Sequence, residues 1–544
     1  MASMIPTLLL SAAAEAFVLT LAVPQYLPAN PLVWTLLRTT LLNIGLYTVY
    51  KVFVYPFFLS PLRHLPSPSG GLPLLGHGLA LFAKPPAVDL LKWVTDIPND
   101  GLIHFRAFFH QDRLLLTSPE ALAEILVKKS YDFEKPGPAR KFLRQILGDG
   151  LIIVEGEEHK FQRKHIMPVF QFRHIKDLYP MMFAKAVQLT QGVEFEIREN
   201  PEDAEKATKV VEINHWANKA TMDVIGVAAL GRDFHALKSA DDELIRNYEE
   251  ILEPTAEKVM FFATQIVGPA TLVRKLPWEV VKRFEITTSS VTRICKELVR
   301  DKKAAFKAKG KRDLDILSVL IESNNFSDEQ LADQMLTFLA AGHETTSSAF
   351  TWTTWLLATH PEIQTRLREE LREALPSNPG PEVDLAAILE SLPMLNAVCN
   401  ETLRLYPTVP ITVRECVNAT TILDQYIPKG VQIIISPWAI NRSPTLWGPA
   451  ADDFVPDRWI NLDGKPNKNG GARSNYAQLT FLHGPRSCIG QGFAQAELRC
   501  LVAAFVSAFE MEPKTKDMVA IPAGVITTKP RDGMELRLTP VVSW

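Results

Sequence analysis

The sequence predicts a mostly α-helical fold with a small β-region, preceded by an amino-terminal membrane anchor. Two apolar stretches open the chain, at residues 5–23 and 32–59, and a long apolar segment without turn signals runs from residue 328 to 359. The β-region is indicated by an alternating stretch over residues 103–117 and by two apolar runs within residues 420–437, separated by Pro-Lys-Gly. Both stretches are expected to form strand pairs.

The composition is that of a folded globular protein and gives no sign of nucleic-acid binding. Of 544 residues, 47% are hydrophobic and 22% charged, with a formal net charge of -3. A local run of basic residues between Lys302 and Arg312 is best explained as a solvated surface. The five cysteines are far apart and form no C-x-x-C pair, which excludes a disulfide framework and a zinc site. This usage fits a catalytic body in a reducing compartment.

The two apolar stretches are each close to the roughly 20 residues needed to cross a bilayer. No Lys or Arg precedes the first stretch, so a retained anchor is favoured over a cleaved secretory signal. One span and a two-span hairpin both remain open. Lys51 and Arg63 follow the second stretch, which places the body on the cytosolic side. The proline-rich segment 61–73 is expected to be a stiff linker.

The apolar segment after Ser327 begins with a capping box and would form a helix about 48 Å long, passing through the interior. Its middle combines Gly342, Glu344 and Thr345, residue types that a buried helix normally avoids. The alternative is a packing glycine beside a structural acid. Several residue types that are unfavourable in a buried helix, occurring together, favour a functional site instead. An acid next to an alcohol suits proton delivery to bound dioxygen, with Glu344 passing protons and Thr345 holding a water. Gly342 would leave room for the gas.

A glycine-rich loop near the carboxyl end surrounds Cys488. Gly490 permits close approach to a flat ligand, and Phe481 is placed to exclude water from the sulfur. The start of the following helix favours the thiolate of Cys488, while Arg486 offers a charge to a carboxylate at the edge of the ligand. A lone thiolate, without a second Cys or His at metal spacing, is unsuited to zinc or iron–sulfur clusters and suits haem iron.

This segment matches the haem-binding signature F-x-x-G-x-R-x-C-x-G at every fixed position, so the chain resembles the cytochrome P450 superfamily, and most nearly the microsomal enzymes of filamentous fungi. Glu401 and Arg404 resemble the E-x-x-R pair of the family, and Arg458 the arginine of its P-x-R segment. Taken alone, the pair would be a surface ion pair; the resemblance implies a buried structural triad. The family's marks span residues 61–544, which we expect to form one domain after an anchor over residues 1–60.

The resemblance also implies contacts with the cofactor. Arg163 and His159 match the family's W-x-x-x-R helix, with His159 in place of the usual Trp, and each is expected to hold a haem propionate; the alternative for His159 is a satisfied polar residue. Arg414 is a further candidate. Ala341 stands where some fatty-acid hydroxylases carry a haem-linking glutamate, so a non-covalent haem b is expected, with Cys488 as the axial ligand of the iron.

By this resemblance the protein is a monooxygenase that inserts one oxygen atom of O2 into a small apolar organic substrate, in fungal secondary metabolism. It would sit in the endoplasmic reticulum membrane, in contact with lipid, with the catalytic domain facing the cytosol. Electrons would come from a separate NADPH–cytochrome P450 reductase, with cytochrome b5 as an optional donor. Four basic residues could form the docking surface for this partner: Lys160, Lys164, Arg173 and Lys176. The alternative is that they merely solvate helix surfaces.

Three other functions remain as alternatives. A fatty-acid hydroxylase would share the same site. A haem-thiolate isomerase or dehydratase would not use O2, and such enzymes tend to lack the acid–alcohol pair. A non-enzymatic haem-binding protein is disfavoured by the glycine-interrupted helix. The substrate pocket is expected to be lined by apolar side chains from segments far apart in the chain: Glu134–Leu151, Asp242–Leu272, Phe338 and Thr408–Val413.

Overall fold

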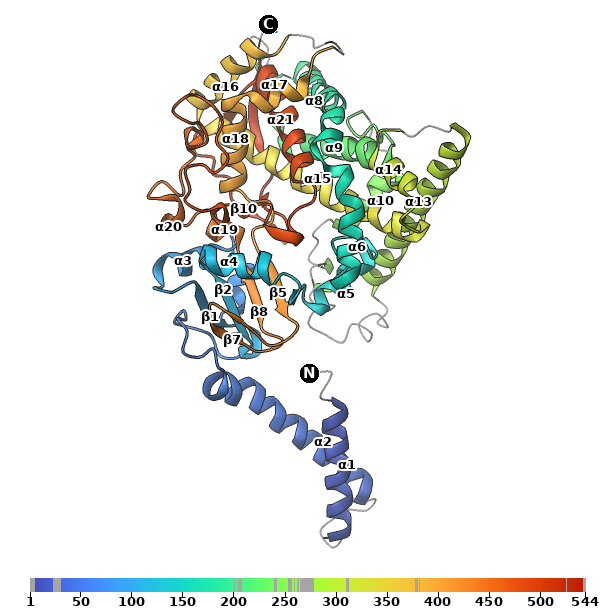
Figure 1. The fold of residues 1–544 in the computed structure, drawn as a ribbon, viewed down its shortest axis with the longest axis vertical. Helices are drawn as coiled ribbons and strands as arrows, with labels where there is room; N and C mark the ends of the chain where they lie inside the picture. The colour runs from blue at the N-terminus through green and yellow to red at the C-terminus, as the bar shows by residue number, and fades with distance from the viewer. Residues whose placement is uncertain are drawn as a thin grey trace.

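A computed structural model shows a helical body from which a helical hairpin projects (Figure 1). It describes residues 1–544 except for residues 1–4, 23–30, 200, 204–207, 239–241, 253–256, 259, 262–263, 265–277, 310–312, 377–379, 381, 525 and 542–544. The predicted pocket stretch 242–272 and the basic run 302–312 therefore lie partly outside the described residues.

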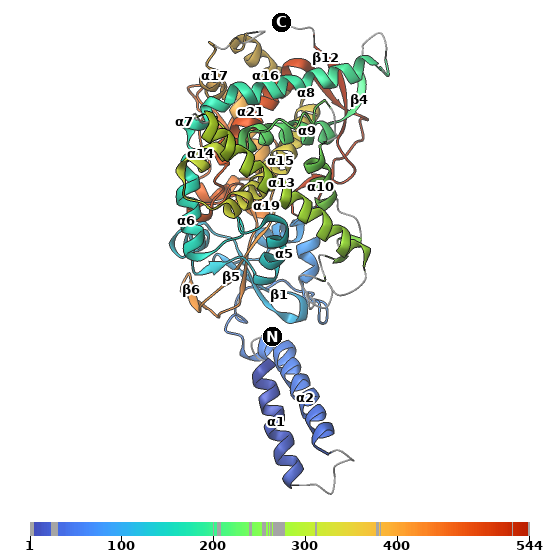
Figure 2. The ribbon, with the colours of Figure 1, turned by 90° about the vertical axis from the view of Figure 1, so that its right-hand side faces the viewer.

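The hairpin consists of α1 (Ile5–Ala22) and α2 (Pro31–Val49), which lie side by side below the body in Figure 2. α2 continues directly into a π-helix, η3 (Tyr50–Leu59). Residues Leu32–Leu59 form a helix that is long and apolar enough to cross a membrane, whereas α1 is shorter. The two apolar stretches predicted from the sequence are thus both helical.

The end of η3 is fastened to the body before the proline-rich linker begins. Arg106 donates a hydrogen bond of 2.9 Å to the carbonyl oxygen of Pro56, and its guanidinium lies 4.3 Å from the ring centre of Phe57. Ser60 donates a hydrogen bond of 2.7 Å to the carboxylate of Asp112. These bonds make the junction between anchor and body a fixed contact.

The main sheet combines strands from distant parts of the chain. The predicted pair over residues 103–117 is confirmed as the antiparallel strands β1 (Leu102–Arg106) and β2 (Asp112–Leu116). β2 pairs in parallel with β8 (Gln432–Ile435), which pairs antiparallel with β5 (Thr412–Cys416). β3 (Phe133–Glu134) completes the order β1-β2-β8-β5-β3.

The second predicted strand pair, across the turn at Gly430, is wrong. β6 (Thr420–Ile422) pairs instead with β7 (Gln425–Ile427), because Leu423 and Asp424 both have positive φ and reverse the chain between them. The run after Gly430 becomes β8 and enters the main sheet. The strands of the main sheet therefore come from both halves of the sequence.

A second sheet, in the order β4-β12-β9, and a two-stranded sheet of β10 and β11 complete the β-structure of the described residues. Their bounds are β4 (Lys209–Glu212), β9 (Phe509–Pro513), β10 (Pro522–Ala523), β11 (Lys529–Pro530) and β12 (Glu535–Pro540). The helices of the body are α3 (Val88–Asp96), α4 (Pro119–Ala123), α5 (Gly137–Leu147), α6 (Gly156–Ile166), α7 (Phe172–Ile175), α8 (Tyr179–Glu199), α9 (Ile213–Ile225), α10 (Glu243–Leu252), α13 (Glu279–Lys309), α14 (Ile316–Ser323), α15 (Asp328–Thr359), α16 (Pro361–Ala374), α17 (Leu385–Ser391), α18 (Pro393–Leu405), α19 (Pro437–Ile440), α20 (Pro444–Trp447) and α21 (Gln491–Ala508).

The predicted interior helix is confirmed as α15, which crosses the centre of the body (Figure 1). Its capping box is complete: the Gln330 N–H donates to Oγ of Ser327 at 3.2 Å, and the Ser327 N–H donates to Oε1 of Gln330 at 3.0 Å. Its middle and carboxyl-terminal turns are largely buried. A helix with so little solvent contact is a rigid element on which to build a site.

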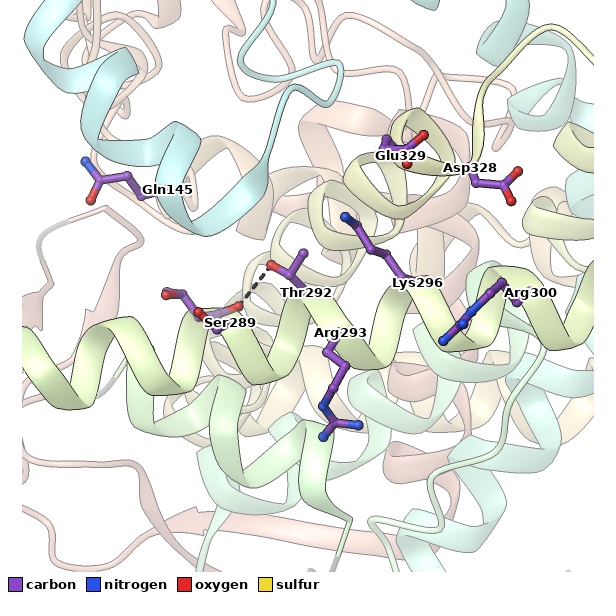
Figure 3. A pocket seen from close by; sticks show the side chains of 9 residues that line it. Gln145, Ser289, Thr292, Arg293, Lys296, Arg300, Asp328 and Glu329 are labelled. Carbon is purple, nitrogen blue, oxygen red and sulfur yellow. Dashed lines mark hydrogen bonds between the residues drawn. The ribbon is translucent and has the colours of Figure 1, made fainter.

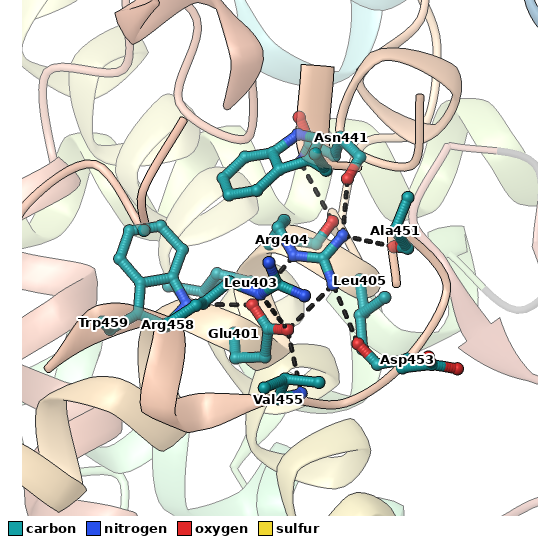
Figure 4. Close-up of polar contacts among 12 residues, drawn as sticks. Glu401, Leu403, Arg404, Leu405, Asn441, Ala451, Asp453, Val455, Arg458 and Trp459 are labelled. Carbon is teal, nitrogen blue, oxygen red and sulfur yellow. Dashed lines mark hydrogen bonds and ion pairs between the residues drawn. The ribbon is translucent and has the colours of Figure 1, made fainter. Parts of the chain in front are cut away.

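Glu401, Arg404 and Arg458 form the predicted buried triad, so the surface ion pair is excluded (Figure 4). Arg404 donates to both carboxylate oxygens of Glu401 at 2.8 Å, and Arg458 Nε donates to the same carboxylate at 2.9 Å. Arg404 also donates to the carbonyl oxygen of Asn441, whose side chain binds Thr480 at 2.9 Å. The network thus ties α18 to the segment that leads into the Cys488 loop.

Candidate active site

Cys488 lies in the loop between a short 3₁₀ turn, η12 (Gly484–Arg486), and α21. The Cys488 N–H donates a 2.9 Å hydrogen bond to the carbonyl oxygen of Phe481, which closes the loop. Gly484 has a φ of 75°, and a Cβ there would lie 2.0 Å from the Leu126 carbonyl oxygen, so only glycine fits. Gly490 has no such constraint from the protein, since an added Cβ would be 3.7 Å from Phe170.

All five cysteines are free, and Cys488 alone among them is exposed. Although the residue is exposed, the protein packed around its sulfur raises the pKa of the Cys488 thiol, while the Gly490 N–H and the charge of Arg163 act in the opposite direction. Burial raises the pKa of Cys295 and Cys399 to about 12. Cys488 is therefore the cysteine whose sulfur is both accessible and surrounded by groups that stabilise a thiolate.

Arg163 and Arg486 hold the two sides of this loop. Arg163, on α6, donates to the carbonyl oxygen of Ser487 at 2.8 Å and to its Oγ at 3.1 Å. Arg486 donates to the carbonyl oxygen of Ser130 at 3.0 Å and forms an ion pair with Glu155. In the part of the chain that the structure describes, Nη2 of Arg486 is buried without a hydrogen-bond partner. A buried guanidinium nitrogen in this state indicates that a further acceptor belongs there.

His159 is buried beside Arg486, and its Nδ1 lies 3.2 Å from the hydroxyl of Tyr131. Burial, together with the charges of Arg486 and Lys135, lowers the pKa of His159 to about 4. The imidazole is consequently neutral near pH 7. One ring nitrogen is engaged with Tyr131, so the other is available to a ligand.

Lys135 and Arg414 belong to the same group of side chains. We call it the cation cluster; it consists of four cations, Lys135, Arg163, Arg414 and Arg486, together with the neutral His159. Burial lowers the pKa of Lys135 to about 8, with Arg414 and Arg486 adding repulsion. Burial and Arg486 also lower the pKa of Arg414 to about 10. Glu155 is the carboxylate that opposes them; although burial acts to raise its pKa, Lys135 and Arg486 hold that pKa below its usual value. So much buried positive charge around one acid fits an anionic ligand.

Lys135 and Glu155 were missed by sequence reasoning. Lys135 falls in the loop assigned to the substrate pocket, and neither residue belongs to a recognisable local pattern. Phe338, predicted to line that pocket, is buried instead and packs edge-on against Phe170 at 5.6 Å between ring centres. Phe338 is thus part of the hydrophobic core, and its lining of a substrate pocket stays a prediction.

Glu344 and Thr345 lie in the middle of α15, partly buried. Glu344 forms an ion pair with Lys529 of β11, a partner that no local sequence signal indicates. Thr345 donates its hydroxyl hydrogen to the carbonyl oxygen of Ala341 at 2.8 Å. Because the hydroxyl oxygen keeps its lone pairs, it can still accept a hydrogen bond from a water. No contact within the described ranges joins either side chain directly to Cys488.

The structure gives Gly342 a packing reason. A Cβ at this position would lie 2.4 Å from Cδ1 of Ile225, so the glycine lets α9 pack directly against α15. The prediction that Gly342 leaves space for a gas or contacts the cofactor stays a prediction.

A cavity of about 610 Å³ lies at the surface, and neither Cys488 nor a member of the cation cluster lines it (Figure 3). Its lining is polar and charged and comes from α5, α13 and the first turn of α15: Gln145, Thr288, Ser289, Thr292, Arg293, Lys296, Arg300, Asp328 and Glu329. Such a lining does not suit an apolar substrate. Among the described residues, no group of three or more His, Cys, Asp or Glu is placed to hold a metal ion.

Comparison with known proteins agrees with this arrangement. The sequence profile of the family described as Cytochrome P450 matches residues 66–536. The chain belongs to the cytochrome P450 family. Cytochrome P450 monooxygenase sphH of Aspergillus fumigatus is 42% identical over 505 residues, with 91% of each chain covered. Cytochrome P450 monooxygenase ptmK of Penicillium ochrochloron is 40% identical over 499 residues, covering 92% of this chain and 97% of its own.

A third relative, cytochrome P450 monooxygenase FUM15 of Gibberella moniliformis, is 37% identical over 547 residues, with 91% of each chain covered. The match runs along nearly the whole helical body, in line with its mostly helical fold and small sheets. Members of the cytochrome P450 family carry haem iron with a thiolate ligand. In this cytochrome P450 the exposed, polarised sulfur of Cys488 and the nearby cation cluster have the chemistry that such a group requires.

Proposed function

We propose that this cytochrome P450 is a membrane-bound monooxygenase that inserts one oxygen atom from O2 into a small apolar organic molecule, in fungal secondary metabolism. The proposal is supported by relatives named as cytochrome P450 monooxygenases over almost the full chain. The observation that carries it is Cys488, an exposed thiol that accepts the Gly490 N–H and faces the charge of Arg163.

Cys488 is proposed as the axial ligand of a haem b. When bound, the haem supplies the iron at which dioxygen is activated, and the thiolate donates electron density to it. Phe481 supports the ligand loop through its carbonyl oxygen, and Gly490 through its N–H. Arg163 positions the loop through Ser487, and its charge stabilises the thiolate.

The cation cluster is proposed to hold the two haem propionates. Arg486 offers its unpartnered Nη2, Arg414 and Lys135 offer buried charge, and neutral His159 offers the N–H of its second ring nitrogen. Because both hydrogen bonds of Arg163 go to Ser487, its contribution to the propionates is that of a nearby charge.

Glu344 and Thr345 are proposed to deliver protons. Lys529 holds the carboxylate of Glu344 at the edge of α15, where it can exchange protons with solvent. The carbonyl of Ala341 fixes the hydroxyl of Thr345, which leaves its oxygen to orient a water.

Electrons are proposed to come from NADPH–cytochrome P450 reductase, at the endoplasmic reticulum membrane and from its cytosolic side. Lys160, Lys164, Arg173 and Lys176 are all exposed on the segment from α6 to the turn after α7. This segment adjoins the Cys488 loop, because Arg163 binds Ser487 and Ile175 lies against Gly492. Such a surface favours an acidic partner close to the thiolate.

The carbon monoxide complex of the reduced protein tests the central claim. Wild type and Cys416→Ala, which removes a buried thiol, should both show the thiolate-type absorption maximum. Cys488→Ala should lose it while keeping the wild-type far-ultraviolet circular dichroism. A preparation that binds no haem, or a Cys488→Ala variant with an unchanged spectrum, contradicts the proposal.

A further inference from the structure

The hairpin of α1 and α2 has small and polar side chains inside and large apolar side chains outside, the reverse of the rest of the molecule. Ala12 and Ala16 are fully buried between the two helices, and Thr35 and Thr39 are 4% and 6% exposed. The large apolar side chains of the hairpin point outward instead: Leu10, Phe17, Leu21, Val33, Leu41 and Leu46. In water this distribution is unfavourable, whereas hydrocarbon around the hairpin makes it favourable.

Hydrogen bonds join the two helices. Thr39 donates its hydroxyl to the carbonyl oxygen of Ala12 at 3.0 Å. Asn43 donates to Oγ of Ser11 at 3.2 Å and to the carboxylate of Glu15 at 3.0 Å. Glu15 is the one ionisable residue of α1, and a charge-bearing side chain is tolerated in a membrane when another helix supplies a partner. α1 therefore acquires from α2 the partner that it lacks alone.

The two helices have the length to cross together. α1 has 18 residues and α2 has 19, which correspond to about 27 and 28 Å, close to the roughly 30 Å of a bilayer core. In Figure 2 they run antiparallel, with the Ile5 end of α1 near the body and its Ala22 end far from it. Arg38 lies within the first two turns of α2, so its side chain can extend its charge to the headgroups beyond the Pro31 end of that helix.

We propose that α1 and α2 both span the bilayer as one packed hairpin, so that the amino-terminal end of α1 lies on the same side of the membrane as the catalytic body. By length and composition alone, only the longer helix, Leu32–Leu59, is a candidate membrane span. The polar contacts inside the hairpin and the apolar side chains outside it indicate that α1 spans the membrane as well. The lipid hydrocarbon core is the partner of the outer surface of α1. This inference rests on the proposed membrane anchor.

Glycosylation mapping of the full chain in microsomes tests the topology. An Asn-Ser-Thr acceptor on a flexible spacer is placed either ahead of Met1 or in the connection between α1 and α2. The hairpin predicts glycosylation in the connection and none ahead of Met1. Glycosylation ahead of Met1, or at neither position, overturns it. Alkaline carbonate extraction separates the two claims: a chain that is extracted lacks an anchor altogether, whereas a retained chain with the wrong glycosylation refutes only the hairpin.

Cysteine cross-linking tests the packing independently, since the native cysteines all lie in the body. Ala12→Cys combined with Thr39→Cys should cross-link under mild oxidation. With a protease site in the connection, α1 would then be released only after reduction. Phe17→Cys combined with Thr39→Cys is the matched control, because Phe17 faces outward at 61% exposure. Equal cross-linking of the two pairs, or none in the first, overturns the proposed packing.

Discussion

Lys529 of β11 forms an ion pair with Glu344 of α15, and so joins the carboxyl-terminal part of the chain to the middle of the central helix. Glu344 is only 14% exposed, while Lys529 is 33% exposed. The pair leaves the carboxylate at a boundary between interior and solvent. That position suits a carboxylate that takes protons from the solvent and passes them to the interior.

Replacing Lys529 should impair proton delivery without unfolding the protein. Lys529→Met releases the carboxylate of Glu344 and should lower the turnover supported by reductase, whereas Lys529→Arg keeps a cation and should retain most of it. Lys514→Met, which removes a surface pair with Glu535, is the control. Equal turnover for Lys529→Met and wild type would show that the pair is purely structural.

Thr345→Ala should keep the haem spectrum and uncouple electron flow from product formation. A group that takes part in proton transfer typically contributes roughly 10²- to 10⁴-fold in rate; without the water that Thr345 orients, we expect NADPH consumption to continue with peroxide as its product. Thr353→Ala is a close control, since Thr353 makes the same 2.8 Å bond to the carbonyl four residues earlier in α15. Peroxide yields that are equal in the two variants would remove Thr345 from the proton path.

Glu401→Gln should strongly destabilise the body. Glu401 and Arg404 are both fully buried, and Glu401 also accepts hydrogen bonds from Arg458 and Trp459. Breaking such a buried pair costs about 3–5 kcal/mol, because the remaining charges stay buried. Asp457→Asn removes only an exposed pair with Arg366 and should cost about 1 kcal/mol or less. Urea unfolding of both variants checks the difference, and a small effect for Glu401→Gln would contradict the burial argument.

The parts that could be predicted from the sequence are those with local signals. The capping box at Ser327 and the continuous apolar run define α15, and the spacing around Cys488 defines the ligand loop. The pairing of β8 could not be predicted, because its partners β2 and β5 are chosen by tertiary packing.

Within the candidate site, too, some residues have a local sequence signal and others do not. Glu344, Thr345 and Cys488 stand in recognisable motifs, whereas Lys135 and Lys529 reach the site from segments without one. The reason for Gly342 also lay outside the motif, since it depends on the approach of Ile225 from another helix. Sequence patterns therefore identify the proposed reacting groups better than the charges that surround them.

Haem affinity should fall as the pH rises above about 8. Lys135 has a pKa of about 8, depressed by burial and by Arg414 and Arg486, so it is charged below that pH and neutral above it. A propionate favours the charged form, and the loss of one proton weakens binding by at most about tenfold per pH unit. Lys135→Arg should remove the pH dependence and keep the affinity for haem. Lys135→Met should remove the pH dependence and also lower the affinity for haem. The rate of haem transfer to a scavenger protein measures this affinity, and a fall in affinity above pH 8 that persists in Lys135→Arg would assign the effect to another group.

Glu497→Gln should make the protein more stable at neutral pH. Glu497, on α21, is 1% exposed, and neither of its oxygens forms a regular hydrogen bond within the described residues, although the Thr346 hydroxyl is close enough to act on its pKa. Burial raises the pKa of this carboxyl well above its usual value of 4.5. In the unfolded chain Glu497 ionises from pH 4.5 upward, while in the folded protein it stays protonated. Stability is therefore lost as the pH rises from 4.5 to the folded-state pKa.

Glutamine keeps the shape of the neutral acid and cannot ionise, so the midpoint of unfolding of Glu497→Gln should match wild type at pH 4.5 and exceed it increasingly at higher pH. A constant difference between the two proteins across this range would mean that Glu497 is ionised in the folded state, in which case the variant should also change the contact with Thr346 and disturb the packing of α21 on α15.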